Sequence, residues 1–319
     1  MTSQLAEITS GAVLDQVGAR SAQQSLRMLV ITAGVGTSIL FIVAGLAVDL
    51  QIFGDGSIFA YSVAAQDAWA FHWHNISGRL FGYLYSFIPA ETYVALTKDP
   101  KGGIAIYGLL RFSAQLLGLI VTLSVDRTKG RTIFVYACLS TACICPLAFG
   151  APTEMLLTHA LFWPALAICH SAPASARGAV ASVVGLLLLV LTHEGAVILS
   201  AVILFAAFPR NGRGTAFIWV VAAWFAAMTI WLIVKLAIRP DDYIAGVLAA
   251  AAYKFIDIRN LVQPIVLLLL ATLAGYGIAA ALLRRLSPAR AHVYAAVGCA
   301  TWPRATAAAG RAAPAPAVL

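Results

Sequence analysis

Residues 50–101 read LQIFGDGSIFAYSVAAQDAWAFHWHNISGRLFGYLYSFIPAETYVALTKDPK and lie between two long apolar segments. The stretch mixes carboxylates, histidines and an arginine, namely Asp55, Asp67, His72, His74, Arg79 and Glu91. The apolar segments on both sides exceed about 18 residues and do not alternate with polar residues, which indicates membrane-crossing helices. The sequence therefore predicts a helical membrane protein in which this polar stretch forms a long first loop.

The composition of the whole chain supports this class. Of its 319 residues, 61% are hydrophobic and 11% are charged, whereas a soluble domain carries about 25% charged residues. In lipid, only helices and closed barrels satisfy the backbone hydrogen bonds. We therefore expect an all-α polytopic integral membrane protein with about eight transmembrane helices and a lipid bilayer as its main partner.

The net charge of +8 does not indicate a nucleic-acid partner. The basic residues lie between the apolar segments, where the positive-inside rule places them on the cytoplasmic side. This rule predicts a cytoplasmic N-terminus and an extracytoplasmic loop over residues 49–102. The five cysteines lie mostly inside apolar segments and are interpreted as small buried side chains.

Three parts follow from these patterns. Residues 1–27 form a polar cytoplasmic lead-in, 28–284 form the multi-pass membrane domain, and 285–319 form a tail rich in Ala, Pro and Arg. The tail has too few large aliphatic residues to fold alone, so we expect it to be disordered. Its abrupt change of composition also fits the truncated or frame-shifted end of a longer protein.

The expected crossing segments follow the apolar runs. The 31-residue run at 178–208 is interrupted by Thr192-His193-Glu194-Gly195 and is too long for one straight crossing of about 20 residues. It is predicted to form two short helices that meet at the outer surface. The other expected spans are residues 28–48, 103–124, 132–150, 153–170, 215–238 and 261–283.

Residues 80–96 are apolar enough to cross the membrane, but the charge rule argues against it. A crossing there would place the basic loop 126–131 outside the cell. The segment also carries five aromatic residues, Phe81, Tyr83, Tyr85, Phe87 and Tyr93, which suit a helix at the headgroup level. Residues 80–96 are therefore predicted to be an interfacial or re-entrant helix within the long first loop.

This topology places most carboxylates on one side. Glu7, Asp15 and Asp126 fall inside, and the other ten fall on the outer face or at outer helix ends. Cations from several stretches fall on the same face. Carboxylates for acid–base or metal chemistry, combined with cations for phosphate, fit a transferase that uses a lipid phosphate.

The segment Phe53-Gly54-Asp55-Gly56-Ser57 after the first span, with Arg79 and the stretch 80–96, resembles the first extracytoplasmic loop of GT-C glycosyltransferases. Those polytopic enzymes use sugars linked to lipid phosphates. The resemblance covers the architecture of residues 28–260 and one acidic position. The chain departs from the family in having fewer expected spans and no large C-terminal periplasmic domain.

The resemblance implies roles for named residues. Asp55 matches the catalytic acidic position, as a general base on the acceptor or as a ligand to a divalent metal, and Asp67 or Glu91 are second candidates. Arg79, Arg239 or Lys254 would hold the donor phosphate. No metal-ligand cluster with a recognisable spacing is present, so the cofactor stays unknown. Asp55 between two glycines equally fits a tight turn.

The remaining polar residues allow more than one interpretation. His193 and Glu194 are predicted to be an acid–base pair or a polar kink satisfied by neighbouring helices, because such a pair inside an apolar run is costly. Glu154 is expected at the outer rim. His159 is interpreted as a hydrogen bond between helices, and Arg111 as an internal counter-charge or a snorkelling residue.

We therefore expect a glycosyltransferase-like protein of a bacterial inner (plasma) membrane that transfers a sugar from a polyprenyl-phosphate donor at the extracytoplasmic face. One alternative is a small-solute transporter, which would need polar residues along the inner half of the membrane. Another is a non-catalytic protein of envelope assembly, whose outer carboxylates would tolerate alanine. The sequence gives no indication of the oligomeric state.

Overall fold

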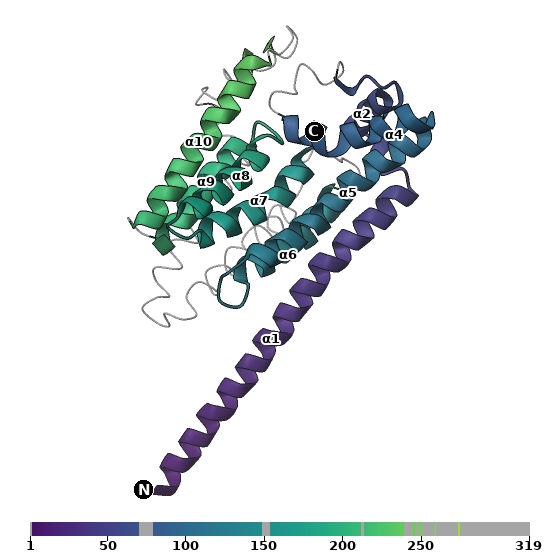
Figure 1. Ribbon diagram of the computed structural model, residues 1–319. Helices are drawn as coiled ribbons and strands as arrows, with labels where there is room; N and C mark the ends of the chain where they lie inside the picture. Colours follow the sequence, from purple (N-terminus) through teal and green to yellow (C-terminus); the bar gives the residue numbers. More distant parts are fainter. Residues whose placement is uncertain are drawn as a thin grey trace, which may run out of the picture. The chain divides into compact units, whose positions relative to one another are not determined.

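The computed structural model describes residues 2–69, 79–148, 154–211 and 214–238, with a few isolated positions further on. Side chains are described from residue 23, except those of Asp55 and residues 209–211. The chain divides into two compact units, residues 1–241 and 242–319, and the labelled helices all belong to the first. Within the described ranges every regular element is a helix (Figure 1), so the predicted all-α class is confirmed there.

The first helix and the start of the loop agree with the predicted boundary. Helix α1 (Thr2–Ala47) is followed by the short helix η1 (Leu50–Ile52) and by α2 (Asp55–Ala64). Two residues with positive φ angles, Asp49 and Gly54, turn the chain before and after η1. Gly54 suits such a position because it has no Cβ.

Residues 79–97 lie against the first half of the next long helix. They include the π-helical turn η2 (Tyr83–Phe87) and α4 (Ile88–Thr97), and are followed by α5 (Pro100–Val125). The Tyr85 hydroxyl donates to the Leu110 carbonyl at 2.9 Å. The chain then reverses at Lys98, whose φ is 58°, and the Asp99 side chain caps α5 by accepting from the Gly102 N–H at 3.0 Å.

Five more helices complete the first unit within the described residues: α6 (Thr132–Ala148), α7 (Glu154–Ser171), α8 (Ala176–Val190), α9 (Ala196–Asn211) and α10 (Thr215–Ala237). The predicted break in the long apolar run is confirmed, because α8 ends at Val190 and α9 begins at Ala196.

Specific contacts fix the directions of these helices. The Gln115 amide of α5 donates to the Leu156 carbonyl near the start of α7 at 2.6 Å, and Gly118 lies against Ala160 further along both. Helices α5 and α7 therefore run in the same direction. Helix α10 begins beside the end of α9, where Phe217 meets Phe208, and its last turn lies beside the turn that precedes α9. Successive long helices thus alternate in direction.

Small residues allow close packing in this bundle. A Cβ on Gly34 of α1 would lie 2.5 Å from the Cys138 carbonyl oxygen of α6. A Cβ on Gly118 would lie 2.4 Å from the Ala160 carbonyl oxygen. Such glycines let helix backbones approach each other, and van der Waals packing then drives association in lipid.

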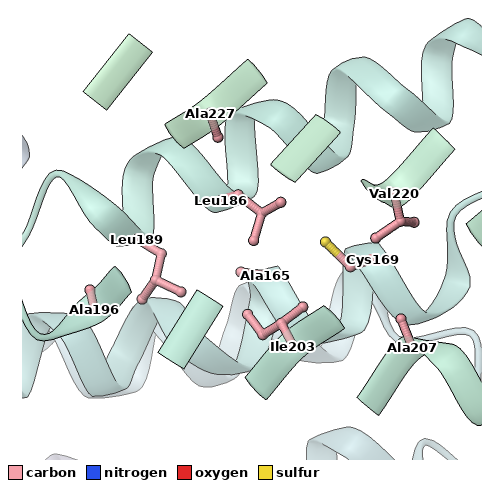
Figure 2. Close-up of a cluster of buried hydrophobic side chains, with 9 residues drawn as sticks. All are labelled: Ala165, Cys169, Leu186, Leu189, Ala196, Ile203, Ala207, Val220 and Ala227. Carbon is pink, nitrogen blue, oxygen red and sulfur yellow. The ribbon is translucent and has the colours of Figure 1, made fainter. Parts of the chain in front are cut away.

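A second packing centre joins α7, α8, α9 and α10. Figure 2 shows Leu186 and Ile203 pointing into the space between these helices, among smaller side chains. Both are fully buried. The cluster consists of Ala165, Cys169, Leu186, Leu189, Ala196, Ile203, Ala207, Val220 and Ala227.

Three helices among the described residues are long and apolar enough to cross a membrane, namely Gln23–Ala47 within α1, α5 and α10. The apolar parts of α6, α8 and α9 are shorter. The 15 residues of α8 span about 23 Å at 1.5 Å per residue, against a hydrocarbon core of about 30 Å. The structure thus establishes a helical protein with membrane-crossing candidates but not the expected eight spans. The last expected span, 261–283, lies outside the described residues.

Candidate functional site

A buried carboxylate lies at the first residue of α7. Glu154 is 4% exposed, and its Oε1 accepts from the Arg111 Nη2 of α5 at 3.3 Å. Its Oε2 lies 3.3 Å from the Arg79 Nη1. One carboxylate therefore holds two guanidinium groups, one from inside α5 and one from the loop segment before η2.

A second carboxylate extends this arrangement. Glu194, in the turn between α8 and α9, accepts from the Lys235 Nζ of α10 at 3.1 Å. Its Oε2 lies 3.7 Å from the Arg79 Nε, so Arg79 bridges both glutamates. We call Arg79, Arg111, Glu154, Glu194 and Lys235 the charged network. It gathers five separate parts of the chain: the segment before η2, α5, the start of α7, the turn between α8 and α9, and the end of α10.

Backbone and hydroxyl hydrogen bonds fix these parts of the chain relative to one another. The Phe81 N–H donates to the Leu191 carbonyl at 2.9 Å, which fixes the segment of Arg79 to the end of α8. The hydroxyls of Thr158 and Thr192 are 2.8 Å apart and link α7 to the same turn. Both threonines are fully buried. The network is therefore supported by the packing of α7 and α8.

The cations outnumber the carboxylates in the network. The Arg111 guanidinium faces the rings of Phe87 and Tyr107, with its carbon 5.6 and 5.4 Å from their centroids. Its Nε and Nη1, and the Nε of Arg79, have no hydrogen-bond partner among the described residues. Among the residues that the structure describes, the network holds three cations and two carboxylates, an excess of one positive charge that favours an anionic ligand.

The two residues of the predicted pair His193-Glu194 differ in charge: His193 is neutral and Glu194 is ionised. Burial lowers the pKa of His193, and Arg79 lowers it further, so the imidazole is neutral at pH 7. The His193 Nδ1 accepts from the Gly195 N–H at 3.0 Å, which assigns the proton to Nε2. Burial raises the pKa of Glu194, but Lys235 and Arg79 outweigh burial and lower it overall. Glu194 is therefore an ionised partner of cations, and His193 a neutral donor.

The second acidic candidates lie in a different place. The Ala68 N–H donates to the Glu91 Oε1 at 2.7 Å, which brings the end of the α2 segment against α4. The pKa of Glu91 is raised by burial first and by Asp67 second. Asp67 and Glu91 therefore form an acidic pair beside α4, built from elements other than those that hold Glu154 and Glu194.

Three predicted residues cannot be placed in the site by their side chains. Asp55 is the first residue of α2, and only its backbone is described. Arg239 and Lys254 lie outside the described residues, as do His72 and His74. In the described part of the chain, no three residues among His, Cys, Asp and Glu gather closely enough to hold a metal ion.

The prediction that His159 makes a hydrogen bond between helices is confirmed. The His159 Nδ1 lies 2.9 Å from the Gln115 Oε1 of α5, and its Nε2 lies 2.7 Å from the Ser140 Oγ of α6. Arg111 confirms the interpretation as an internal counter-charge, with Glu154 as its partner. Lys235 was not among the predicted site residues, although a lysine within an apolar helix signals a functional or paired position.

Comparison with known proteins gave no match: no family model, curated protein or solved structure resembles this chain significantly.

Proposed function

We propose that this protein is a membrane glycosyltransferase that transfers a sugar from a polyprenyl-phosphate donor, with the charged network as the donor-phosphate site. The observation that carries the proposal is the excess of cations at the end of the bundle where the loop helices α2 and α4 pack on α5. Arg79 is the best phosphate ligand, because its side chain is 21% exposed, more than those of Lys235 (17%) and Arg111 (5%).

The proposed topology has about eight spans, with the N-terminus in the cytoplasm of a bacterial inner membrane. Arg27 near the start of the apolar part of α1 lies beside Gly130 of the basic loop. That end of the bundle therefore carries the arginines and lysine of the 126–131 loop, as the positive-inside rule requires of a cytoplasmic face. The charged network lies at the opposite, extracytoplasmic end.

In the proposed reaction, Asp55 takes the proton of an acceptor hydroxyl. The oxygen of that hydroxyl attacks the anomeric carbon of the sugar. The bond from that carbon to the phosphate oxygen breaks, and the negative charge stays on the lipid phosphate. Arg79 stabilises this charge. Glu154 and Glu194 position Arg79 from two sides, and the Nε2–H of His193 offers a neutral hydrogen-bond donor beside the phosphate.

The decisive experiment uses a strain in which deletion of this protein changes a surface glycan. We expect Asp55→Asn and Arg79→Gln to fail to restore the glycan and to accumulate the lipid-linked sugar donor. Asp99→Asn is the matched control, because asparagine caps a helix as well as aspartate and Asp99 serves as the cap of α5. Normal glycan in the Asp55→Asn strain would exclude the catalytic role of Asp55.

The same strains separate the alternatives. A solute transporter would show substrate flux in proteoliposomes without consuming a lipid-linked sugar. An assembly protein would tolerate Asp55→Ala and Arg79→Gln together, provided that both variants reach normal levels in the membrane.

A further inference from the structure

A polar cluster in the apolar part of the bundle lies outside the charged network. Its members come from three helices: Gln115 of α5, Ser140 of α6 and His159 of α7. The His159 Nδ1 lies 2.9 Å from the Gln115 Oε1, and its Nε2 lies 2.7 Å from the Ser140 Oγ. A hydroxyl, an imidazole and an amide are thus joined in one chain of hydrogen bonds. This is the arrangement that activates the nucleophile of acyl-transfer enzymes.

Neighbouring hydrogen bonds determine which nitrogen of His159 carries the proton. The Gln115 Nε2 donates to the Leu156 carbonyl at 2.6 Å, so the Gln115 Oε1 faces the imidazole, and this oxygen can only accept. The proton of His159 is therefore assigned to Nδ1. The Trp163 Nε1–H donates to the His159 Nε2 at 3.3 Å, which agrees with an unprotonated Nε2. This nitrogen can therefore take the hydroxyl proton of Ser140, as a general base must.

The hydroxyl of Ser140 is directed differently from those of other helical serines. The hydroxyls of Ser38 and Ser182 donate to carbonyls four residues earlier in their own helices, which is a common way for a helical serine to satisfy its hydroxyl. The Ser140 hydroxyl donates instead to His159 on another helix. Ser140 and His159 are both half-buried, so packing does not enclose the pair completely.

A cavity of about 320 Å³ lies beside Ser140 and His159, and this volume is within the range of small-molecule sites. Its apolar walls come from three helices and include Ile144 of α6, Met155 and Phe162 of α7, and Leu199 of α9. Met155, at one end of the lining on α7, is 48% exposed. The cavity therefore suits an apolar chain that carries a single polar group beside Ser140.

We propose that Ser140, His159 and Gln115 form an acyl-transfer site, separate from the charged network, that cleaves the acyl ester of a membrane lipid. The Ser140 Oγ attacks the acyl carbonyl carbon, and the His159 Nε2 takes the hydroxyl proton. The bond from that carbon to the alcohol oxygen of the lipid breaks, and His159 gives the proton to this oxygen. Water then attacks the acyl-serine, His159 passes one proton of the water to the Ser140 oxygen, and a fatty acid leaves. Gln115 is a positioning residue that keeps the proton on Nδ1.

Trp163 supplies a donor for the negative charge that develops on the acyl oxygen. It lines the same cavity, and its indole N–H donates to the His159 Nε2 before the reaction. Once Nε2 has taken the Ser140 proton it no longer accepts a hydrogen bond, so the indole N–H turns to the oxyanion. Loss of one such donor slows a reaction by about 10²–10³-fold.

The test exposes the full chain in nanodiscs to an alkyl fluorophosphonate, which forms a covalent adduct with activated serines, and locates the adduct by mass spectrometry. We expect the adduct on Ser140, and hydrolysis of p-nitrophenyl octanoate that Ser140→Ala abolishes. Trp163→Phe should slow labelling about 100-fold with little change in Tm. The matched control is Ser182→Ala, which should label like the unsubstituted chain, because the Ser182 hydroxyl is bonded within its own helix.

The other two members of the cluster are tested by the rate of labelling at Ser140. His159→Gln should abolish labelling. Gln115→Glu should keep it, because a carboxyl oxygen still accepts from Nδ1–H, whereas Gln115→Leu should slow it; equal rates in Gln115→Leu and the unsubstituted chain would overturn the positioning role of Gln115. An unsubstituted, folded chain that gains no adduct on Ser140 overturns the proposal. So does labelling of Ser140 that His159→Gln leaves unchanged, because the histidine then does not activate the serine.

Discussion

Replacing Glu154 by glutamine should strongly destabilise the protein. The change keeps the shape of the side chain but removes the charge that holds Arg111 and Arg79. The Arg111 side chain is 5% exposed, so its charge stays buried with only the Phe87 and Tyr107 rings to compensate for it. Breaking a buried ion pair in this way costs about 3–5 kcal/mol. Arg79 adds little to this cost, because it is partly exposed and keeps Glu194 as a partner.

The thermal unfolding of purified protein in nanodiscs provides the measurement. For a unit of about this size, each kcal/mol shifts Tm by about 2–4 °C, so Glu154→Gln should lower Tm by about 6–20 °C. Glu91→Gln is the matched control. Its Oε1 accepts a hydrogen bond from the Ala68 N–H, which a glutamine oxygen can also accept, so the change in Tm should be small.

A second substitution tests the mechanism itself. If the cost comes from the orphaned guanidinium, Arg111→Met in the Glu154→Gln background should restore part of the lost stability, because no buried charge then remains without a partner. We expect a coupling free energy of about 1–3 kcal/mol in this double-mutant cycle. Additive effects of the two substitutions, or a normal Tm for Glu154→Gln alone, would refute the reasoning.

Three further predictions concern the rest of the bundle. Asp126→Asn should destabilise the protein by about 1–2 kcal/mol, because Oδ1 accepts from the Thr128 N–H and Oδ2 from the Phe134 N–H, whereas an amide has only one accepting oxygen. Burial raises the pKa of Asp126, but these hydrogen bonds lower it overall below its usual range, so the contribution is present at neutral pH and lost as pH falls through that lowered pKa, as acid titration of Tm would show. Gly34→Ala should lower Tm, since its Cβ would collide with the α6 backbone, whereas Gly36→Ala should not, since the space there is open. Lys235→Met should raise the pKa of Glu194 towards its ordinary value, which NMR titration of a ¹³C-labelled glutamate carboxyl can follow.

Much of the local structure could be predicted from residue patterns. The apolar run at 178–208 contained a polar interruption that breaks it into two helices, and the structure has that break at residues 191–195. The Asp99-Pro100 start of α5 is a local capping signal, since aspartate caps and proline suits the first turn. These features depend on neighbours in sequence, so no tertiary information is needed to find them.

Membrane crossing could be predicted less completely. Hydropathy identifies α5 and α10 because each is long and apolar over its whole length. For α8 and α9 the same signal is ambiguous, because each is shorter than the bilayer core. Whether such a helix crosses depends on its neighbours and on local bilayer thickness, which the pattern of one segment does not contain.

The sequence by itself determined that the chain is helical, where its helices break, and which end of each helix carries charge. Those properties follow from apolar periodicity, helix-breaking residues and the positions of Lys and Arg. Only the tertiary structure decided that Arg79 joins Glu154 to Glu194, and that Lys235 and Arg111 complete the network. The physical reason is that these pairs are separated by 41 to 115 positions in sequence, so only the alternating directions and close packing of α5, α7, α8 and α10 bring them within 4 Å.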